Sequence, residues 1–313
     1  MALLDARPKS KLTTNVFEVG KFEVTAISVG TSSASTSPPK PLFIVSPILQ
    51  GTYPVVLFLH GFCLKNQFYN SVLQHVASHG YILVAPQLYL PPIITSGTQE
   101  IEYAAEVTNW LAEGLPPVLP TNVHPDFHKL GLSGHSRGGK AAFALALGLA
   151  QTSLKLNFAV LIGVDPVAGT SKDQQILPVI LKYVPKSFNI NIPVAVIGTG
   201  LGPEAKYFFP SCAPNGLNHE EFFNESKPPR CHFVTSDYGH IDMLDDDFIL
   251  DLIKNFACVT GKGPRDPMRK CVGGIMVAFM GAYLSGESED LKAIVKEPEI
   301  APVKLDSVEF DEE

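Results

Sequence analysis

The sequence has no excess of basic residues. Its 313 residues include 24 Lys and Arg against 31 Asp and Glu, which gives a formal net charge of −7. No basic stripe is available to neutralise phosphates, so the composition excludes a nucleic-acid-binding protein. Hydrophobic residues make up 45% of the chain and charged residues 18%, a balance typical of a folded protein with a large core.

The sequence also lacks a hydrophobic run long enough to span a bilayer. Its most apolar segment, residues 271–284, is shorter than the roughly 20 residues that a spanning helix needs, and we expect a buried helix there. Residues 1–11 carry charges without the apolar centre of a secretory signal. They also lack the Ser- and Arg-rich, acid-poor composition of a clear transit peptide. We therefore expect an intracellular protein with no membrane span.

Cysteine is scarce and scattered. The chain has five, and no two of them show the spacing of metal ligands: Cys63, Cys212, Cys231, Cys258 and Cys271. This pattern favours reduced thiols in an intracellular compartment and no metal site. A Cys212–Cys231 or Cys258–Cys271 bridge stays open as an alternative.

Apolar runs alternate with helical patterns along the chain, which predicts an α/β fold with a mostly parallel central sheet and helices on both faces. The expected strands are residues 42–48, 55–60, 82–86, 130–134, 158–164, 194–199 and 232–236. The expected helices are residues 68–78, 100–113, 138–150, 248–257 and 272–284. No repeat or second domain is visible, so we expect a single domain over 1–313, with a variable segment at 1–40 and a flexible acidic tail at 296–313.

A serine stands between a predicted strand and a predicted helix. Residues 134–138 match G-x-S-x-G around Ser136, the pattern of a nucleophile elbow, in which a tight strand-to-helix turn exposes the serine hydroxyl. The motif alone is weak, but the expected strand 55–60 ends in His60-Gly61-Phe62. The backbone N–H groups of Phe62 and Arg137 are therefore candidates for an oxyanion hole.

Such a serine needs a base and an acid. Of nine histidines, only His219, His232 and His240 lie beyond the later predicted strands. His240 follows the strand 232–236 in a Gly-containing loop, which is where the base is expected. Two carboxylates compete for the acid: Asp165, directly after strand 158–164, and Glu204, after strand 194–199.

Several longer motifs resemble the plant chlorophyllases, a family of α/β-hydrolase fold. The most specific is Asp-Tyr-Gly-His-Ile-Asp-Met-Leu at 237–244. The other matching stretches are residues 53–56, 78–89, 134–140, 161–169 and 212–223. The resemblance covers roughly residues 40–285 and places the family's triad on Ser136, Asp165 and His240.

The resemblance implies a serine esterase that hydrolyses the phytyl ester of chlorophyll to chlorophyllide and phytol without a cofactor. The substrate's magnesium needs no ligand from this chain. A chloroplast location follows by resemblance, with the cytosol as an alternative because no transit peptide is visible. The lipophilic substrate allows peripheral membrane contact, and the sequence leaves the oligomeric state open. A general lipase or carboxylesterase with the same triad, and a non-enzymatic ligand receptor, are the rival interpretations.

Overall fold

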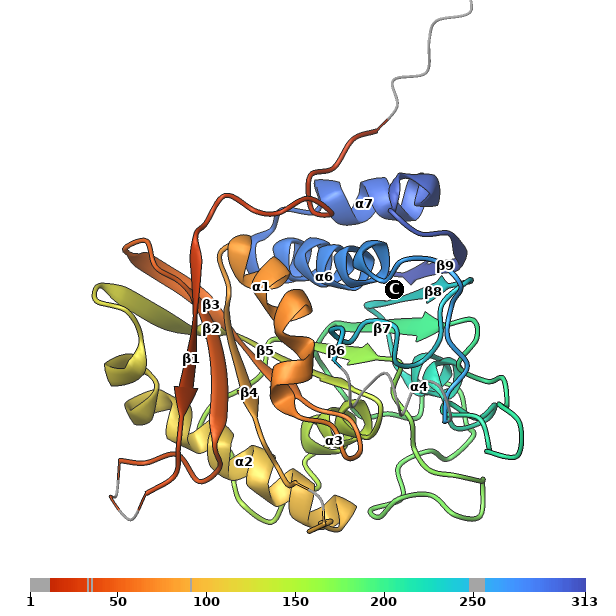
Figure 1. Ribbon diagram of the computed structural model, residues 1–313, viewed down its shortest axis with the longest axis horizontal. Helices are drawn as coiled ribbons and strands as arrows, with labels where there is room; N and C mark the ends of the chain where they lie inside the picture. The colour runs from red at the N-terminus through yellow and green to blue at the C-terminus, as the bar shows by residue number, and fades with distance from the viewer. Residues whose placement is uncertain (1–11, 33, 35, 91, 248–256) are drawn as a thin grey trace, which may run out of the picture.

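The computed structural model describes residues 12–32, 34, 36–90, 92–247 and 257–313. Their strands form one nine-stranded sheet in the order β1-β2-β4-β3-β5-β6-β7-β8-β9 (Figure 1). The strands are β1 Val24–Val29, β2 Leu42–Pro47, β3 Gly51–Leu59, β4 Ile82–Pro86, β5 Val123–His135, β6 Val160–Val164, β7 Val194–Thr199, β8 Arg230–Thr235 and β9 Leu305–Asp311. Pairing is parallel from β4 through β8 and antiparallel at both edges. The expected mostly parallel sheet is confirmed.

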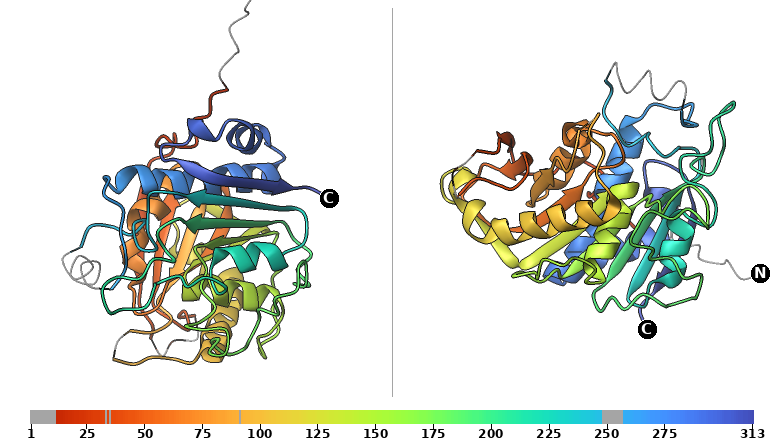
Figure 2. Two further views of the ribbon diagram at one scale, coloured as in Figure 1. Left: turned by 90° about the vertical axis from the view of Figure 1, so that its right-hand side faces the viewer. Right: turned by 90° about the horizontal axis from the view of Figure 1, so that it is seen from below.

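Helices cover both faces of this sheet (Figure 2). The described α-helices are α1 Asn70–Ser78, α2 Gly97–Gly114, α3 Arg137–Ala146, α4 His219–Glu225, α6 Asp266–Met280 and α7 Glu289–Lys296. One core cluster contains buried residues of α1 and α6, and the other contains those of α2 and α3. Of the expected helix at 248–257, residues 248–256 lie outside the described part of the chain. Within that part, every helix is too short or too polar to cross a bilayer.

Strand β3 shows why the sheet needs helices on both sides. Val55, Leu57 and Leu59 are buried in the cluster with α2 and α3, while Val56 and Phe58 are buried in the cluster with α1 and α6. Successive side chains of a strand point to opposite faces, so a continuous apolar run must be covered twice. This strand therefore lies in the middle of the molecule, and its carboxyl end, at residue 59, leads into the site.

Both chain ends contribute to the fold, and the C-terminal end differs from the sequence-based expectation. The segment 1–40 contains β1, which pairs with β2, and Val16 and Phe17 are buried in the core. Residues 296–313, expected to be a flexible acidic tail, contain β9, which pairs antiparallel with β8. The acidic composition obscured an alternating pattern, because Val308 and Phe310 pack against the core on either side of the exposed Glu309. The tail prediction was therefore wrong for residues 305–311.

The expectation of five reduced thiols was also wrong. Cys212 and Cys258 form a disulfide with a Cα–Cα distance of 5.6 Å across a sequence separation of 46. Cys231 and Cys271, which featured in the two bridges left open, are buried free thiols, and Cys63 is also free. Pairing depends on which Cβ atoms the fold brings together, and spacing in the sequence carries little of that information.

Candidate active site

The serine motif forms the sharp turn between β5 and α3. Ser136 has φ 57° and ψ −126°, a strained conformation for a residue with a side chain. A Cβ on Gly134 would lie 2.4 Å from the carbonyl oxygen of Gly138, and one on Gly138 would lie 2.3 Å from that of Leu59. Only glycine fits at these two positions, so the chain can turn here and place Ser136 at the carboxyl end of the sheet.

Three polar side chains meet at this turn from separate parts of the sequence. His240 Nε2 lies 2.8 Å from Ser136 Oγ, and His240 Nδ1 lies 2.7 Å from Asp165 Oδ2. Asp165 follows β6 directly, and His240 follows β8 in the chain. Exposure is 7% for Ser136, 0% for Asp165 and 4% for His240, so the hydrogen-bonded line is nearly sealed from solvent. A buried line of this kind can pass a proton from a hydroxyl to an imidazole.

The charge of Asp165 is supported by its partners. Burial raises its pKa, but the hydrogen bond and charge of His240, with smaller contributions from His219 and Thr199, hold the pKa below the ordinary aspartate value. Thr199 Oγ1 donates to Asp165 Oδ2 at 2.6 Å. The carboxylate can therefore fix His240 as the tautomer with a proton on Nδ1 and bare Nε2 toward the serine.

The rival acid lies elsewhere. Glu204 is exposed in the loop after β7, and its backbone N–H donates to the carbonyl of Leu201. In the described ranges no hydrogen bond or ion pair joins Glu204 to His240, whereas Asp165 contacts His240 directly.

The turn after β3 packs against the serine. A Cβ on Gly61 would lie 3.2 Å from Ser136 Cβ. His60 fixes this turn, because its Nδ1–H donates to the carbonyl of Gly61 at 2.8 Å and its Nε2 accepts from the Leu88 N–H at 3.0 Å. The backbone N–H groups of Phe62 and Arg137 donate to no acceptor in the described part of the chain. Two N–H donors, on the residues that follow Gly61 and Ser136, thus remain without an acceptor in the described ranges.

A buried network that the sequence did not reveal connects these parts. The Gly61 N–H donates to Tyr69 Oη at 2.9 Å, and the Tyr69 hydroxyl donates to His135 Nδ1 at 2.8 Å. His135 Nε2–H donates to the backbone carbonyl of His240 at 2.8 Å. Burial lowers the pKa of His135 to about 3, so this imidazole is neutral and keeps one donor and one acceptor nitrogen. Tyr69 and His135 therefore tie the Gly61 turn to the His240 loop.

The side chain of Arg137 points away from the serine. It forms an ion pair with buried Glu100, with Nη2 2.9 Å from Oε1, and donates from Nη2 to the Thr95 carbonyl at 2.6 Å. Its guanidinium also lies over the rings of Phe62 and Tyr89 at 5.3 and 5.8 Å. These contacts hold the first turn of α3 against the rim of the site. Among the described residues, no three His, Cys, Asp or Glu side chains gather as a metal site.

The sheet order, the elbow turn and the hydrogen-bonded Ser, His and Asp side chains together define the class: a hydrolase of α/β-hydrolase fold. The family model described as Chlorophyllase matches residues 12–312. The chain belongs to the chlorophyllase family.

Curated relatives match most or all of the chain. The chain is 50% identical to Chlorophyllase-1 of Arabidopsis thaliana over 321 residues, covering 100% of this chain and 98% of the relative. It is 46% identical to "Chlorophyllase-1, chloroplastic" of Citrus unshiu, covering 99% and 95% of the two chains. It is 47% identical to Chlorophyllase-2 of Arabidopsis thaliana, covering 90% and 92%.

Proposed function

We propose that this chain is a chlorophyllase that hydrolyses the phytyl ester of chlorophyll to chlorophyllide and phytol. Family membership supports the substrate. The single observation that supports the chemistry is that His240 lies at hydrogen-bond distance from both partners, with Nε2 toward Ser136 Oγ and Nδ1 toward Asp165 Oδ2. The magnesium of chlorophyll belongs to the substrate, and the proposed reaction needs no further metal or cofactor.

In the proposed mechanism Ser136 Oγ attacks the ester carbonyl while its proton passes to His240 Nε2. Asp165 stabilises the resulting imidazolium through Nδ1–H. The negative oxygen of the tetrahedral intermediate lies against the N–H groups of Phe62 and Arg137, which have no other acceptor in the described ranges. The C–O bond to phytol then breaks and phytol leaves with the proton from His240. Water, deprotonated by the same imidazole, releases chlorophyllide and restores the serine.

Apolar side chains around the site fit a lipophilic ester. Phe62, Leu90, Ile93 and Ile94 are 47%, 46%, 72% and 54% exposed on the segments that follow β3 and β4. Exposed apolar residues grouped in this way are costly in water and are typical of binding surfaces. We propose that they form part of the path by which the phytyl chain enters.

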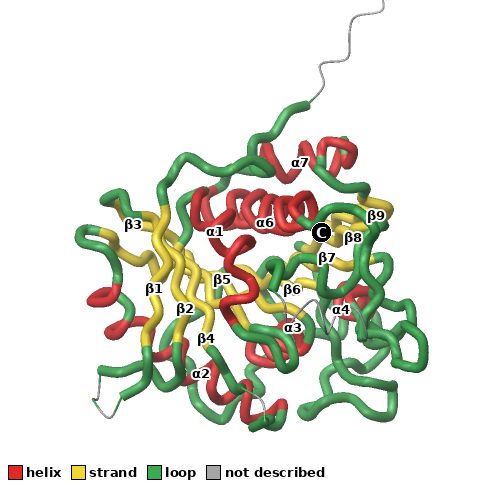
Figure 3. Tube along the Cα trace, viewed as in Figure 1, coloured by secondary structure: helices red, strands yellow, loops and turns green. Residues whose placement is uncertain are grey.

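A second exposed group suits contact with a lipid surface. The connection from β7 to α4 is loop along its length (Figure 3) and carries Tyr207, Phe208 and Phe209, which are 79%, 103% and 51% exposed. The Phe209 N–H donates to the Lys206 carbonyl at 3.0 Å, so the three rings stand on a closed turn. Aromatic side chains presented this way can insert into the headgroup region of a bilayer. We propose peripheral membrane contact through this turn.

The compartment proposed is the chloroplast, because two relatives that match over nearly the whole chain are named chloroplastic. Imaging of the full-length chain fused to a fluorescent protein tests this directly. Fluorescence outside chlorophyll-containing organelles would contradict it.

The proposed substrate is tested by product analysis. Purified protein is incubated with chlorophyll and, separately, with a short p-nitrophenyl ester, and the products are separated by chromatography. We expect chlorophyllide and phytol, with a higher kcat/KM on chlorophyll than on the short ester. A preference for the short ester would indicate a general carboxylesterase. Failure of a fluorophosphonate probe to label Ser136 would indicate a ligand receptor.

A further inference from the structure

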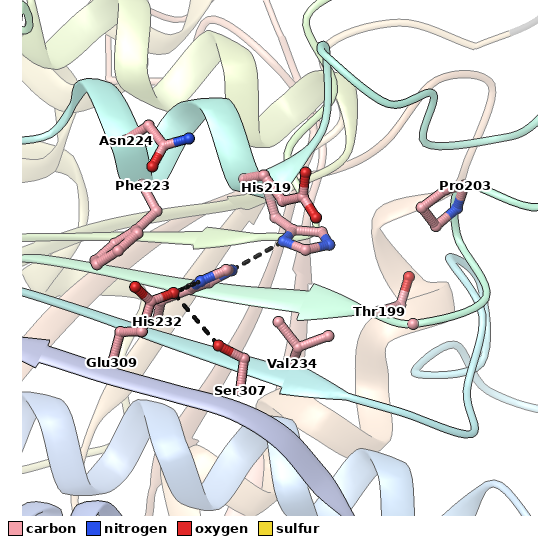
Figure 4. Close-up of a pocket in the computed structure, with 11 residues that line it drawn as sticks. Thr199, Pro203, His219, Phe223, Asn224, His232, Val234, Ser307 and Glu309 are labelled. Carbon is pink, nitrogen blue, oxygen red and sulfur yellow. Dashed lines mark hydrogen bonds and ion pairs between the residues drawn. The ribbon is translucent and has the colours of Figure 1, made fainter. Parts of the chain in front are cut away.

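A second hydrogen-bonded line runs from His219 through His232 to Glu309 (Figure 4). His219 Nδ1 lies 2.8 Å from His232 Nε2, and His232 Nδ1 lies 3.1 Å from Glu309 Oε1. The three residues come from α4, β8 and β9. Both histidines are 3% exposed, whereas the side chain of Glu309 is 55% exposed. We call these three side chains the relay.

The hydrogen bonds fix where the protons of the relay lie. The carboxylate of Glu309 only accepts, so His232 must carry its proton on Nδ1. A neutral His232 then accepts on Nε2, and His219 must donate from Nδ1. Burial lowers the pKa of both imidazoles below the ordinary histidine value, which favours this neutral arrangement at neutral pH. His219 Nε2 is left with a bare lone pair.

The relay is electrically coupled to the triad. Asp165 and His240 both interact with His219, and Asp165 also interacts with His232. A Cβ on Gly198 would lie 2.3 Å from the His219 ring, so this glycine of β7 lets the imidazole pack directly on the strand that carries Thr199. The second oxygen of the triad acid, Oδ1, is buried without a hydrogen-bond partner in the described part of the chain. Because Asp165 and His219 are 0% and 3% exposed, solvent would screen a new charge on His219 poorly.

We propose that His219 is a positioning residue for ester hydrolysis that acts through His240: it leaves this base available while neutral and weakens it when the relay takes up a proton. The proposal rests on the assignment of Ser136, Asp165 and His240 as the triad.

The direction follows from the charges that face the relay. The charged and titratable groups that interact with it are Asp165, Glu220, Glu309, Arg230 and His240. The three carboxylates favour one added proton, and Arg230 and His240 oppose it. Once bound, that proton places a cation near His240, where the mechanism must form an imidazolium. Like charges disfavour one another, so the reaction slows.

The test is the pH dependence of kcat/KM, with each profile divided by its own plateau. In the wild-type protein we expect kcat/KM to fall with decreasing pH more steeply than uptake of a single proton allows. In His219→Gln we expect the acidic limb of the kcat/KM profile to have the slope of a single protonation. At the acidic end its relative kcat/KM should exceed that of the wild type on the order of ten-fold. The reason is that the variant lacks the like charge near His240, whose repulsion is felt at an effective dielectric constant of about 20. His75→Gln is the matched control, because His75 is also buried with a lowered pKa but lies on α1.

A second variant covers the case in which His219→Gln does not fold. Glu309→Gln removes the charge at the exposed end of the relay while its side-chain oxygen can still accept from His232. The relay then binds its proton less tightly, so the steep part of the limb should move to lower pH.

Histidine ¹⁵N spectra give a readout apart from activity. At neutral pH we expect His219 and His232 both as Nδ1–H tautomers. An Nε2–H proton on neutral His219, or acidic limbs that coincide for wild type, His219→Gln and Glu309→Gln, would overturn the proposal. The triad assignment fails separately, if Ser136→Ala keeps its activity.

Discussion

Tyr69→Phe removes a single oxygen from the network that ties the Gly61 turn to the elbow. The Tyr69 ring is fully buried, and its hydroxyl accepts from the Gly61 N–H and donates to His135 Nδ1. Phenylalanine keeps the ring but leaves both partners buried without a hydrogen bond. Each such orphan costs about 1–3 kcal/mol, so we expect the free energy of unfolding to fall by about 2–6 kcal/mol.

The same change should slow turnover. Complete loss of one oxyanion donor costs about 100- to 1000-fold in kcat, and a displaced turn should cost less, on the order of ten-fold. The effect should fall on kcat more than on KM, because the proposed Phe62 donor acts on the transition state.

Tyr53→Phe is the matched control for both measurements. Tyr53 is also buried on β3, but it lies near the other end of the strand, and its hydroxyl donates at 2.8 Å to the carbonyl of Leu49, a residue that is 61% exposed. Water can replace that bond, so we expect a loss of about 1 kcal/mol or less and an unchanged kcat. Denaturant unfolding and steady-state kinetics compare the two variants. Equal stabilities would refute the network, and equal kcat values would refute its role in positioning the turn.

Three further predictions concern the acid, a buried lysine and the aromatic turn. Asp165→Asn should lower turnover by roughly four orders of magnitude by favouring the wrong imidazole tautomer, whereas Glu204→Gln should change turnover little. Steady-state rates in the reverse order would identify Glu204 as the acid. Burial lowers the pKa of Lys140 to about 7. Between pH 7 and 10.5 the unfolded chain therefore binds more protons than the native state, so the native state gains stability as pH rises through that range. Lys140→Met should raise the free energy of unfolding by about 1–4 kcal/mol at pH 7 and by little near pH 10.5, and denaturant melts that show no gain at pH 7 would contradict this. Phe208→Ser should weaken co-sedimentation with phosphatidylcholine vesicles but leave hydrolysis of detergent-dispersed chlorophyll unchanged. The control Val19→Ser, at another exposed apolar residue, should alter neither. Equal vesicle binding by the two variants would show that the aromatic turn does not contact the membrane.

The sequence was most informative where one physical requirement dominates. The strands at 82–86 and 194–199 have the predicted bounds, because each is a short apolar run with glycine, proline or glutamine close to its ends. The glycines at 134 and 138 pointed to a turn that no larger residue can make. His240 was predicted as the base by elimination, since the chain carries few histidines after its later strands, and it lies 2.8 Å from Ser136 Oγ.

The rest depended on contacts between distant segments. Nothing in the sequence around Tyr69 distinguishes it from other buried aromatic residues, and its role appears only when η1, Asn66–Tyr69, lies beside His135. Glu309 looked like part of a solvated acidic tail because four of the five residues 309–313 are acidic, and only the pairing of β9 with β8 brings it to His232. The Cys212–Cys258 pair has the same origin. Interactions across the fold leave little local pattern to read.

The most direct test of the central claim compares chlorophyll hydrolysis by the wild-type protein and by Ser136→Ala under identical conditions, with chlorophyllide quantified by chromatography and folding checked by circular dichroism. The account predicts chlorophyllide and phytol from the wild type and a loss of turnover on the order of a million-fold in the variant. Absence of chlorophyllide with the wild type, or more than a few per cent of its rate in a folded Ser136→Ala protein, would contradict it.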